Sequence, residues 1–407
     1  MSVTGIIVEY NPLHNGHIYH INKTKQITGC QYIIAVMSGN FVQRGEPAII
    51  NKWARARAAL LSGIDLVIEL PTIFSISSAE GFAFGAISVL NSLGIVDNIC
   101  FGSEVGDIDK LFYISKILYQ EPEEYRLMLK KYIKSGLSYP AARQYSLYKY
   151  IIDKNDVNVN TKDIEKLINN PNNILSIEYI KALLTLNSNI KPYTIKRIIS
   201  SYNDEKLSGS ISSATSIRKN FYNDIIKNSL PQYSYEIIEE EKINGRAPII
   251  IDDFSNIILY KLRTEGLDYI SSILDVTEGL EYKIKKASED SNSINELIKN
   301  IKSKRYTESR IKRILIYSLL GITKEYWKNN MNSALKYIRI LGFNSNGKKL
   351  LREIKTKCNI PIITNPSPKD SIFLDMDIRA TDLYVLGYKN ILYKYAKQDL
   401  KTPPVII

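Results

Sequence analysis

Short apolar runs alternate with amphipathic segments over the first 102 residues of the chain. The apolar runs are rich in Ile, Val and Leu and lie at 5–10, 32–38, 65–70 and 98–102. Segments with helical spacing separate them, at 17–29, 52–63 and 77–94. Strands this uniformly apolar are buried on both faces, as in a parallel sheet covered by helices. The pattern therefore predicts an α/β fold with a doubly wound parallel sheet, whose ligands bind beyond the carboxyl ends of the strands.

The hydrophobic pattern changes further along the chain. Residues 107–186 have helical spacing, after which 191–198 predicts another strand and 211–220 a helix that begins at hydroxyl residues. Beyond about residue 225 the spacing is mainly helical and lysine is frequent, until a strand-like run at 360–364. The chain therefore changes character near residue 225.

Charge supports a division of the chain at that point. The net charge is +12, and residues 1–225 carry 24 basic and 20 acidic side chains, against 30 and 22 in the shorter part that follows. Such an excess attracts polyanions such as RNA, although a lysine-rich proteome also raises it. We expect an α/β domain at 1–225 and a mainly helical, basic region at 226–407.

Several sequence features indicate a cytoplasmic protein. Cys30, Cys100 and Cys358 are odd in number and far apart, which fits neither a disulfide framework nor a zinc knuckle. No apolar run approaches the roughly 18 to 20 residues that cross a bilayer. The first residues lack the basic and small-residue features of a signal peptide.

The three histidines of the chain, His14, His17 and His20, lie close together after the first predicted strand. Positions three and six apart cannot all share one face of a regular helix, and no cysteine pair or H-E-x-x-H motif lies nearby to complete a metal site. We therefore expect no protein-bound metal. The alternative is an anion site, because His17 would stand in the first turn of a helix, beside unpaired N–H groups.

A second candidate motif is ISSATSIR at 211–218, a hydroxyl-rich helix start that is followed by Arg218. Hydroxyl groups, helix N–H groups and a guanidinium together suit a triphosphate. Plain helix capping is the alternative explanation of its hydroxyl residues, which are Ser212, Ser213, Thr215 and Ser216.

Other polar residues would stand on the ligand side of the sheet. They belong to the segment after the second strand and are Ser38, Gly39, Asn40, Gln43, Arg44 and Lys52. Gly102, at the end of a later strand, would let a nucleotide approach the backbone. A solvated loop and a simple bend are the alternatives.

Two basic segments in the second part are candidates for RNA contact. In KSKRYTESRIKR (302–313), the basic residues Lys304, Arg305, Arg310, Lys312 and Arg313 are placed around Tyr306. Basic residues with an interleaved aromatic suit phosphate contact and base stacking, and a solvated basic helix is the alternative. Residues 337–355 form a second basic segment.

The H-x-G-H spacing of His14, Gly16 and His17, together with ISSATSIR, resembles the signature of the nucleotidyltransferase superfamily, which has a Rossmann-like fold. The resemblance implies that the two imidazoles contact the phosphates of ATP and that Gly16 leaves room for the adenosine. Nucleotidyl transfer needs cations and N–H donors around the α-phosphate, usually with Mg²⁺, and no nucleophilic side chain.

The blocks VEYNPLHNGH, MSGNFVQRGEPA, FGSE, PNNIL, YTIKR, SATSIR and KRYTESR occur in this order. They closely resemble the bacterial tRNA(Met) cytidine acetate ligase family over essentially the whole chain. The resemblance implies ATP-dependent N4-acetylation of the wobble cytidine in elongator tRNA(Met), with acetate as co-substrate and acetyl-adenylate as intermediate. It implies an ATP-binding catalytic part at 1–225 and a tRNA-binding part at 226–407, with no stable protein partner.

The resemblance also implies the functional residues. The expected catalytic residues are His14, His17 and Arg218. The expected ATP-binding residues are Ile7, Val8, Glu9, Tyr10, Asn11, Pro12, Leu13, His14, Asn15, Gly16, His17, Ile18, Tyr19, His20, Gly102, Asn172 and Arg197, with Asn172 favoured over Asn173. The expected tRNA contacts are Lys304, Arg305, Tyr306, Arg310 and Arg313.

Two other functions compete with this interpretation. An adenylyltransferase acting on a small metabolite would have a similar active site, but it would not need a long basic extension. An RNA-binding protein with a degenerate nucleotide site is the other alternative. The intact residues His14, Gly16, His17 and Arg218 speak against it.

Overall fold

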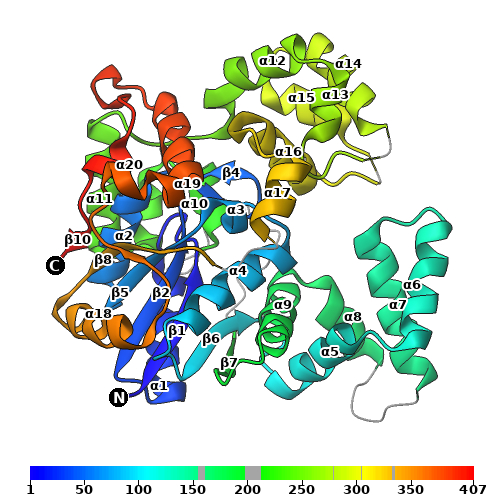
Figure 1. The fold of residues 1–407 in the computed structure, drawn as a ribbon, viewed down its shortest axis with the longest axis horizontal. Helices are drawn as coiled ribbons and strands as arrows, with labels where there is room; N and C mark the ends of the chain where they lie inside the picture. The colour runs from blue at the N-terminus through cyan, green and yellow to red at the C-terminus, as the bar shows by residue number, and fades with distance from the viewer. Residues whose placement is uncertain (155–160, 198–211, 278, 304, 332–334) are drawn as a thin grey trace.

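The computed structural model describes residues 1–407 with the exception of 155–160, 198–211, 278, 304 and 332–334. An eight-stranded sheet has the order β10-β8-β5-β2-β1-β6-β7, with β9 beside β8 (Figure 1). Its strands are β1 (Val3–Val8), β2 (Tyr32–Ser38), β5 (Leu66–Leu70), β6 (Asn98–Ser103), β7 (Lys191–Lys196), β8 (Ile338–Phe343), β9 (Ile362–Ile363) and β10 (Val405–Ile406). β8 is antiparallel to β5, whereas the other pairings of this sheet are parallel.

Helices cover both faces of the sheet, which confirms the predicted doubly wound α/β fold. Successive residues of β2 point to opposite faces, so Ile34 and Val36 join one core cluster, while Ile33, Ala35 and Met37 join another. The first cluster also contains side chains from α4 (Ala79–Ser92), α9 (Pro171–Thr185) and α18 (Ser345–Lys357). The second contains side chains from α1 (Asn15–Thr28) and α2 (Lys52–Leu61). Burial on both faces explains why the strand sequences are apolar throughout.

The strand order reverses at β1. From β1 the chain proceeds outward to β2 and β5, and it then returns to place β6 and β7 on the other side. In a sheet of this kind the ligand crevice lies beyond the carboxyl ends of the strands that flank the reversal. The fold therefore directs attention to the ends of β1 and β6, and to the helix α1 that follows β1.

Two groups of helices extend from one side of the sheet (Figure 1). The first comprises α5 (Ile108–Gln120), α6 (Glu123–Lys134), α7 (Tyr139–Asp153) and α8 (Thr161–Asn169). The second comprises α12 (Ser255–Thr264), α13 (Leu267–Ser272), α14 (Leu280–Asp290), α15 (Ile294–Ile301), α16 (Glu308–Leu320) and α17 (Lys324–Met331). Most of the second group shares a core cluster of its own with α19 (Ser371–Tyr384). Within the described residues, no helix is long and apolar enough to cross a membrane.

The segments after residue 225 contribute strands as well as helices. β8 pairs directly with β5, and β9 and β10 pair with β8, so the second part of the chain completes the sheet of the first. The basic segment 337–355 is therefore not one exposed helix: it begins with the buried strand β8 and continues into α18. The division of the chain after residue 225 stays a prediction.

Candidate active site

A cavity of about 660 Å³ opens at the carboxyl ends of β1 and β6. It brings together most of the residues that the sequence assigned to ATP binding or to catalysis. They are Ile7, Val8, Glu9, Tyr10, Asn11, His14, Gly16, His17, Tyr19, His20, Gly102, Asn172, Arg197 and Arg218. Residues as distant in the chain as Ile7 and Arg218 therefore meet at the predicted edge of the sheet.

Four expected residues do not line this cavity: Pro12, Leu13, Asn15 and Ile18. Leu13 is buried in the core cluster beneath the turn, and Ile18 packs against the same cluster. Asn15 turns outward and donates its side-chain amide to the carbonyl of Asn228 at 3.1 Å. A contiguous block of sequence at a turn and helix start places only part of its side chains on one surface.

The first two histidines form a fixed pair at the start of α1. His14 is the N-cap residue, and its Nδ1 accepts a hydrogen bond from the Gly16 N–H at 3.1 Å. His17 makes a second hydrogen bond, in which its Nδ1 accepts from the His14 N–H at 3.1 Å. The two rings stack with centroids 3.8 Å apart. With both Nδ1 atoms accepting, each neutral imidazole carries its proton on Nε2, where it can donate to a ligand.

Burial keeps these imidazoles neutral. It lowers the pKa of His14 to about 3, with Arg197 and Arg218 adding to the shift. Burial also holds the pKa of His17 well below its usual value, assisted by His14 and Arg197. His20 follows the same pattern, with burial and then Arg197 lowering its pKa to about 4. All three are therefore N–H donors and not cations at neutral pH.

Arg218 and Arg197 contribute cationic charge to the cavity, which Arg44 and Lys219 also line. Arg218 lies in the short helix α10 (Ala214–Lys219) and donates to the Asn11 carbonyl at 2.9 Å and to the Thr215 hydroxyl at 3.3 Å. Ser213 caps this helix by accepting from the Ser216 N–H at 3.1 Å, so capping and cavity lining are combined in one motif. Arg197, after β7, passes over Gly102, where a β-carbon would come within 3.2 Å of the Arg197 side chain.

The two neighbouring asparagines of α9 have different surroundings. Asn172 lines the cavity, and its side-chain amide donates to Oε1 of Glu104 at 2.6 Å. Asn173 is fully buried away from the cavity, and its Oδ1 accepts from the Glu104 and Val105 N–H groups. Glu104 also accepts from the first N–H groups of α9, so a carboxylate of the protein already occupies that helix terminus. The geometry favours Asn172 as the ligand-facing residue.

Sequence reasoning missed an apolar side of the cavity. Its members are Phe82, Phe101, Leu175 and Tyr179, from α4, β6 and α9. Tyr10 adds a buried hydroxyl that has no hydrogen-bond partner in the described part of the chain. Nothing in the spacing of these apolar residues separates them from ordinary core positions, so only the fold reveals them.

Some residues of the loop after β2 line the cavity, and others lie in the interior of the protein. Gln43 and Arg44 line the cavity, and the Gln43 N–H donates to Oε1 of Glu9 at 3.0 Å. Ser38, Gly39, Asn40 and Lys52 do not line it. Arg55, which is also buried, donates to the carbonyls of Glu9 at 2.7 Å and Ser38 at 3.0 Å. It therefore ties the loop after β1 to the loop after β2 beneath the cavity.

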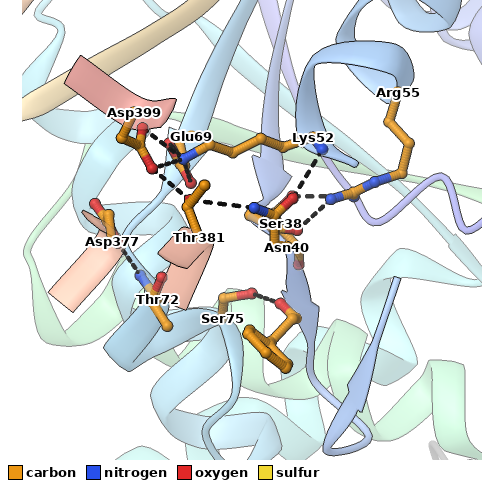
Figure 2. A network of polar contacts seen from close by, with 12 residues as sticks. Ser38, Asn40, Lys52, Arg55, Glu69, Thr72, Ser75, Asp377, Thr381 and Asp399 are labelled. Carbon is orange, nitrogen blue, oxygen red and sulfur yellow. Dashed lines mark hydrogen bonds and ion pairs between the residues drawn. The ribbon is translucent and has the colours of Figure 1, made fainter. Parts of the chain in front are cut away.

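Lys52 is a structural residue and not a ligand-side cation. Its ammonium lies 2.8 Å from carboxylate oxygens of both Glu69 and Asp399, and all three side chains are about 1% exposed. Figure 2 shows this network, in which Thr381 contacts both Asp399 and the Asn40 amide. The expectation that Lys52 faces the ligand is wrong because buried carboxylates surround it.

Several basic and aromatic side chains of the segment 302–313 contact other parts of the protein, which its composition does not indicate. Tyr306 is 8% exposed, and its hydroxyl donates to the Thr277 carbonyl at 3.1 Å, so its ring is packed in the protein rather than open for base stacking. Arg310 lies over that ring and donates to the Asp275 carbonyl at 2.8 Å. Arg313 lies 3.7 Å from the Asp275 carboxylate. Arg305 is exposed, and Lys304 lies outside the described residues.

Comparisons with known proteins agree with this geometry. The family model described as HIGH Nucleotidyl Transferase matches residues 1–399. A tRNA(Met) cytidine acetate ligase from a Thermoanaerobacter species is 48% identical over 96% of each chain, and one from Acetivibrio thermocellus is 46% identical over the full length of both. The chain belongs to the tRNA(Met) cytidine acetate ligase family.

Solved structures of the family have the same fold. The crystal structure of apo Thermotoga maritima TmcAL is 37% identical and covers both chains completely, with a TM-score of 0.95. A second crystal structure of that protein, bound with alpha-thio ATP, gives a TM-score of 0.93 at the same identity and coverage. This member of the tRNA(Met) cytidine acetate ligase family is therefore an ATP-using ligase with a nucleotidyltransferase domain.

Proposed function

We propose that this chain activates acetate with ATP and transfers the acetyl group to N4 of the wobble cytidine of elongator tRNA(Met). A carboxylate oxygen of acetate attacks the α-phosphorus, and the bond to pyrophosphate breaks. The cytidine amine then attacks the acetyl carbonyl, AMP leaves, and the amine loses a proton. The names of the full-length relatives support the substrates, and the observation that carries the ATP step is the stacked pair of histidines at the start of α1, which lines the cavity and is fixed by backbone N–H groups.

The proposed role of the cavity is to bind and orient the triphosphate. His14 and His17 present Nε2 donors, and the start of α1 adds its helix dipole. Arg218 and Arg197 neutralise the charge that develops as pyrophosphate leaves. Because His14, His17 and Arg218 are held by hydrogen bonds to the backbone, they need little reorganisation during the reaction. Asn172 and Gly102 would stand beside the adenosine.

In this proposal, Mg²⁺ binds to the protein together with the nucleotide. Among the described residues, no group of three His, Cys, Asp or Glu side chains could hold a metal ion. The carboxylates that line the cavity already have partners, since Glu104 accepts from α9, Glu46 pairs with Lys312 and Glu9 accepts from Gln43. Mg²⁺ characteristically keeps its waters and binds through substrate phosphates, which suits such a site.

The tRNA is proposed to contact the part of the chain after residue 225. That part carries the larger positive excess, 30 basic against 22 acidic side chains. Residues 1–225 would hold ATP and acetate in a cytoplasmic enzyme without a stable protein partner. The division is proposed for function, since both parts contribute to the sheet.

Mass analysis of cytidines after incubation of elongator tRNA(Met) with the protein, ATP and acetate tests the function directly. We expect N4-acetylcytidine at the wobble position, and none when ATP or acetate is omitted. Transfer of AMP to a small metabolite without any acetylation of tRNA would instead identify an adenylyltransferase. Unmodified tRNA under all conditions would contradict the proposal.

The histidine pair has a test of its own. Replacing His14 and His17 with alanine removes two donors from the phosphates, and the loss of one such donor typically costs about 10²- to 10³-fold in rate. We expect acetate-dependent exchange between pyrophosphate and ATP to be abolished. Gln26→Ala, on the exposed side of the same helix, is the matched control and should leave exchange unchanged. Normal exchange in the double variant would remove both histidines from the chemistry.

A further inference from the structure

Glu46 lies between two cations that come from distant segments of the chain. It belongs to β4 (Glu46–Pro47), the second strand of a small hairpin that starts with β3 (Phe41–Val42), and it lines the ATP cavity. Its Oε2 is 3.8 Å from Nη2 of Arg218, and its Oε1 is 2.7 Å from Nζ of Lys312 in α16. The three side chains are only 18–24% exposed, so solvent and salt screen these charges less than they screen surface pairs.

The contact between the hairpin and α16 is close and involves the backbone. Gly45 has φ +75°, and a β-carbon there would lie 2.4 Å from the Arg313 nitrogen and 2.6 Å from the Lys312 carbonyl carbon. Lys312 is also held by Glu308, one turn earlier in α16, at 3.1 Å. The Glu46 and Glu308 carboxylates outweigh burial and raise the pKa of Lys312, so it stays charged. Its ammonium is therefore fixed behind the cavity without lining it.

We propose that Lys312 is a positioning residue of the ATP site, which holds the Glu46 carboxylate and compensates its charge so that Arg218 remains directed at the triphosphate. Without Lys312, Glu46 would be left with Arg218 as its cationic partner. It would then draw the guanidinium away from the phosphates and add an uncompensated negative charge to a site for a polyanion. The inference rests on the proposed ATP-dependent function, and it makes the active site depend on a helix beyond residue 225.

Lys312→Met tests the inference, because it removes the charge and keeps most of the side-chain volume. We expect KM for ATP in acetate-dependent pyrophosphate exchange to rise roughly fivefold, the size of a favourable ion pair, with little change in kcat. Lys312→Arg should retain a KM close to that of the wild type. Lys299→Met, an exposed lysine in the neighbouring helix α15, is the matched control and should change neither constant.

The decisive variant combines Lys312→Met with Glu46→Gln. If Lys312 acts by compensating Glu46, removing the carboxylate should return KM for ATP to within about twofold of the wild type. Damage to packing would instead make the double variant no better than the single one. A wild-type KM in Lys312→Met, or no recovery in the double variant, would overturn the inference.

Calorimetric ATP binding separates this inference from the proposed function. If the wild type shows no acetate-dependent exchange, the proposed function fails, while the Kd values of the same variants still test Lys312. A Kd that rises in Lys312→Met and recovers in the double variant supports the positioning role. Equal Kd values in all variants reject it.

Discussion

At the residue scale, the histidines of this protein combine donor chemistry with a permanent lack of charge. Each Nδ1 of the stacked pair accepts a backbone N–H, so each neutral ring carries its proton on Nε2, from which it would donate to the proposed ligand. His20 also has a buried Nε2 with no partner among the described residues. Positive charge is supplied by other side chains instead, among them Arg197 and Arg218, whose guanidinium groups cannot be deprotonated near neutral pH. The site therefore separates hydrogen bonding from charge neutralisation.

Burial of neutral imidazoles makes stability depend on pH with a predictable sign. Below pH 6.5 the imidazoles of the unfolded chain take up protons, whereas in the folded protein the pKa of His14 is about 3 and that of His20 about 4. The contribution of these histidines to the free energy of unfolding is therefore fully present above pH 6.5, and it is lost as the pH falls toward these values. In urea unfolding, His20→Gln should reduce the loss between pH 7.5 and pH 5 by on the order of 2 kcal/mol relative to wild type.

Gln26→Ala is the control for this measurement, because it changes an exposed residue of the same helix. Its stability should follow the wild-type dependence on pH. Parallel curves for the wild type and His20→Gln would show that His20 titrates normally in the folded protein, and the burial argument would then fail.

The sequence predicted the site residues that belong to a recognisable motif. It missed those that contribute only apolar surface to the cavity. H-x-G-H and the final arginine of ISSATSIR are unusual combinations at fixed points of the fold, and His14, His17 and Arg218 do meet in the cavity. Phe82 and Tyr179 have ordinary core spacing, so their position beside the cavity depends on helix packing. Lys52 was placed wrongly because its partner Asp399 is 347 residues away in the chain.

At the element scale, the β3–β4 hairpin connects the sheet to α16, because it contacts that helix directly. We expect Gly45→Ala to separate the two, because its β-carbon would overlap the backbone of α16 at 2.4 Å. A residue with a β-carbon at φ +75° also costs about 1–2 kcal/mol by itself. Gly136→Ala, at φ +90° with no atom within 4 Å, measures that conformational cost alone.

Thermal unfolding and KM for ATP together check the hairpin. Gly45→Ala should lower Tm more than Gly136→Ala does and should raise KM for ATP, since Glu46 and Lys312 would no longer meet. Gly136→Ala should leave KM unchanged. Equal effects of the two substitutions on both quantities would show that the hairpin contact is unimportant.

The segment before α16 should contribute to RNA binding through Arg305 rather than through Tyr306. Arg305 is exposed, whereas Tyr306, Arg310 and Arg313 pack within the protein. Arg305→Ala should weaken tRNA binding and reduce the slope of log K against log salt by about one. Arg313→Ala should mainly lower Tm. Filter binding over a salt series distinguishes these results, and an unchanged slope in Arg305→Ala would contradict the assignment.

Element types were predictable where periodicity is strong, and the predicted strands at 32–38 and 65–70 agree with β2 and β5. β8 was hidden because Arg339 and the basic helix that follows made 337–355 resemble a single charged segment. Arg339 is fully buried and donates to the Thr364 carbonyl at 2.6 Å, a contact that local sequence does not reveal. Tertiary burial, and not composition, decides the conformation of such a strand.

At the scale of the whole molecule, buried charges fasten the last segments of the chain to the first. Lys52 and Glu69 belong to α2 and β5, while Asp399 comes from α20 (Gln398–Lys401) and Thr381 from α19 (Figure 2). Burial raises the pKa of Glu69, with Asp377 and Asp399 adding to the shift and Lys52 opposing it. The buried carboxylates thus need the positive charge of Lys52, and Lys52 is held by carboxylates from both parts of the chain. Breaking a buried pair of this kind by removing one partner costs about 3–5 kcal/mol.

Residues 1–225 should therefore not form a stable protein by themselves, although they contain the H-x-G-H and ISSATSIR motifs. The fragment would lack β8, which covers the edge of β5, and Asp399, which faces Lys52. We expect it to show no cooperative thermal transition by circular dichroism, and co-expression with residues 226–407 should restore one. In the full chain, Asp399→Asn should lower Tm far more than Asp375→Asn, which affects only an exposed pair. A fragment that melts cooperatively near the full-length Tm would mean that the buried charge network and the shared sheet edge are dispensable for folding.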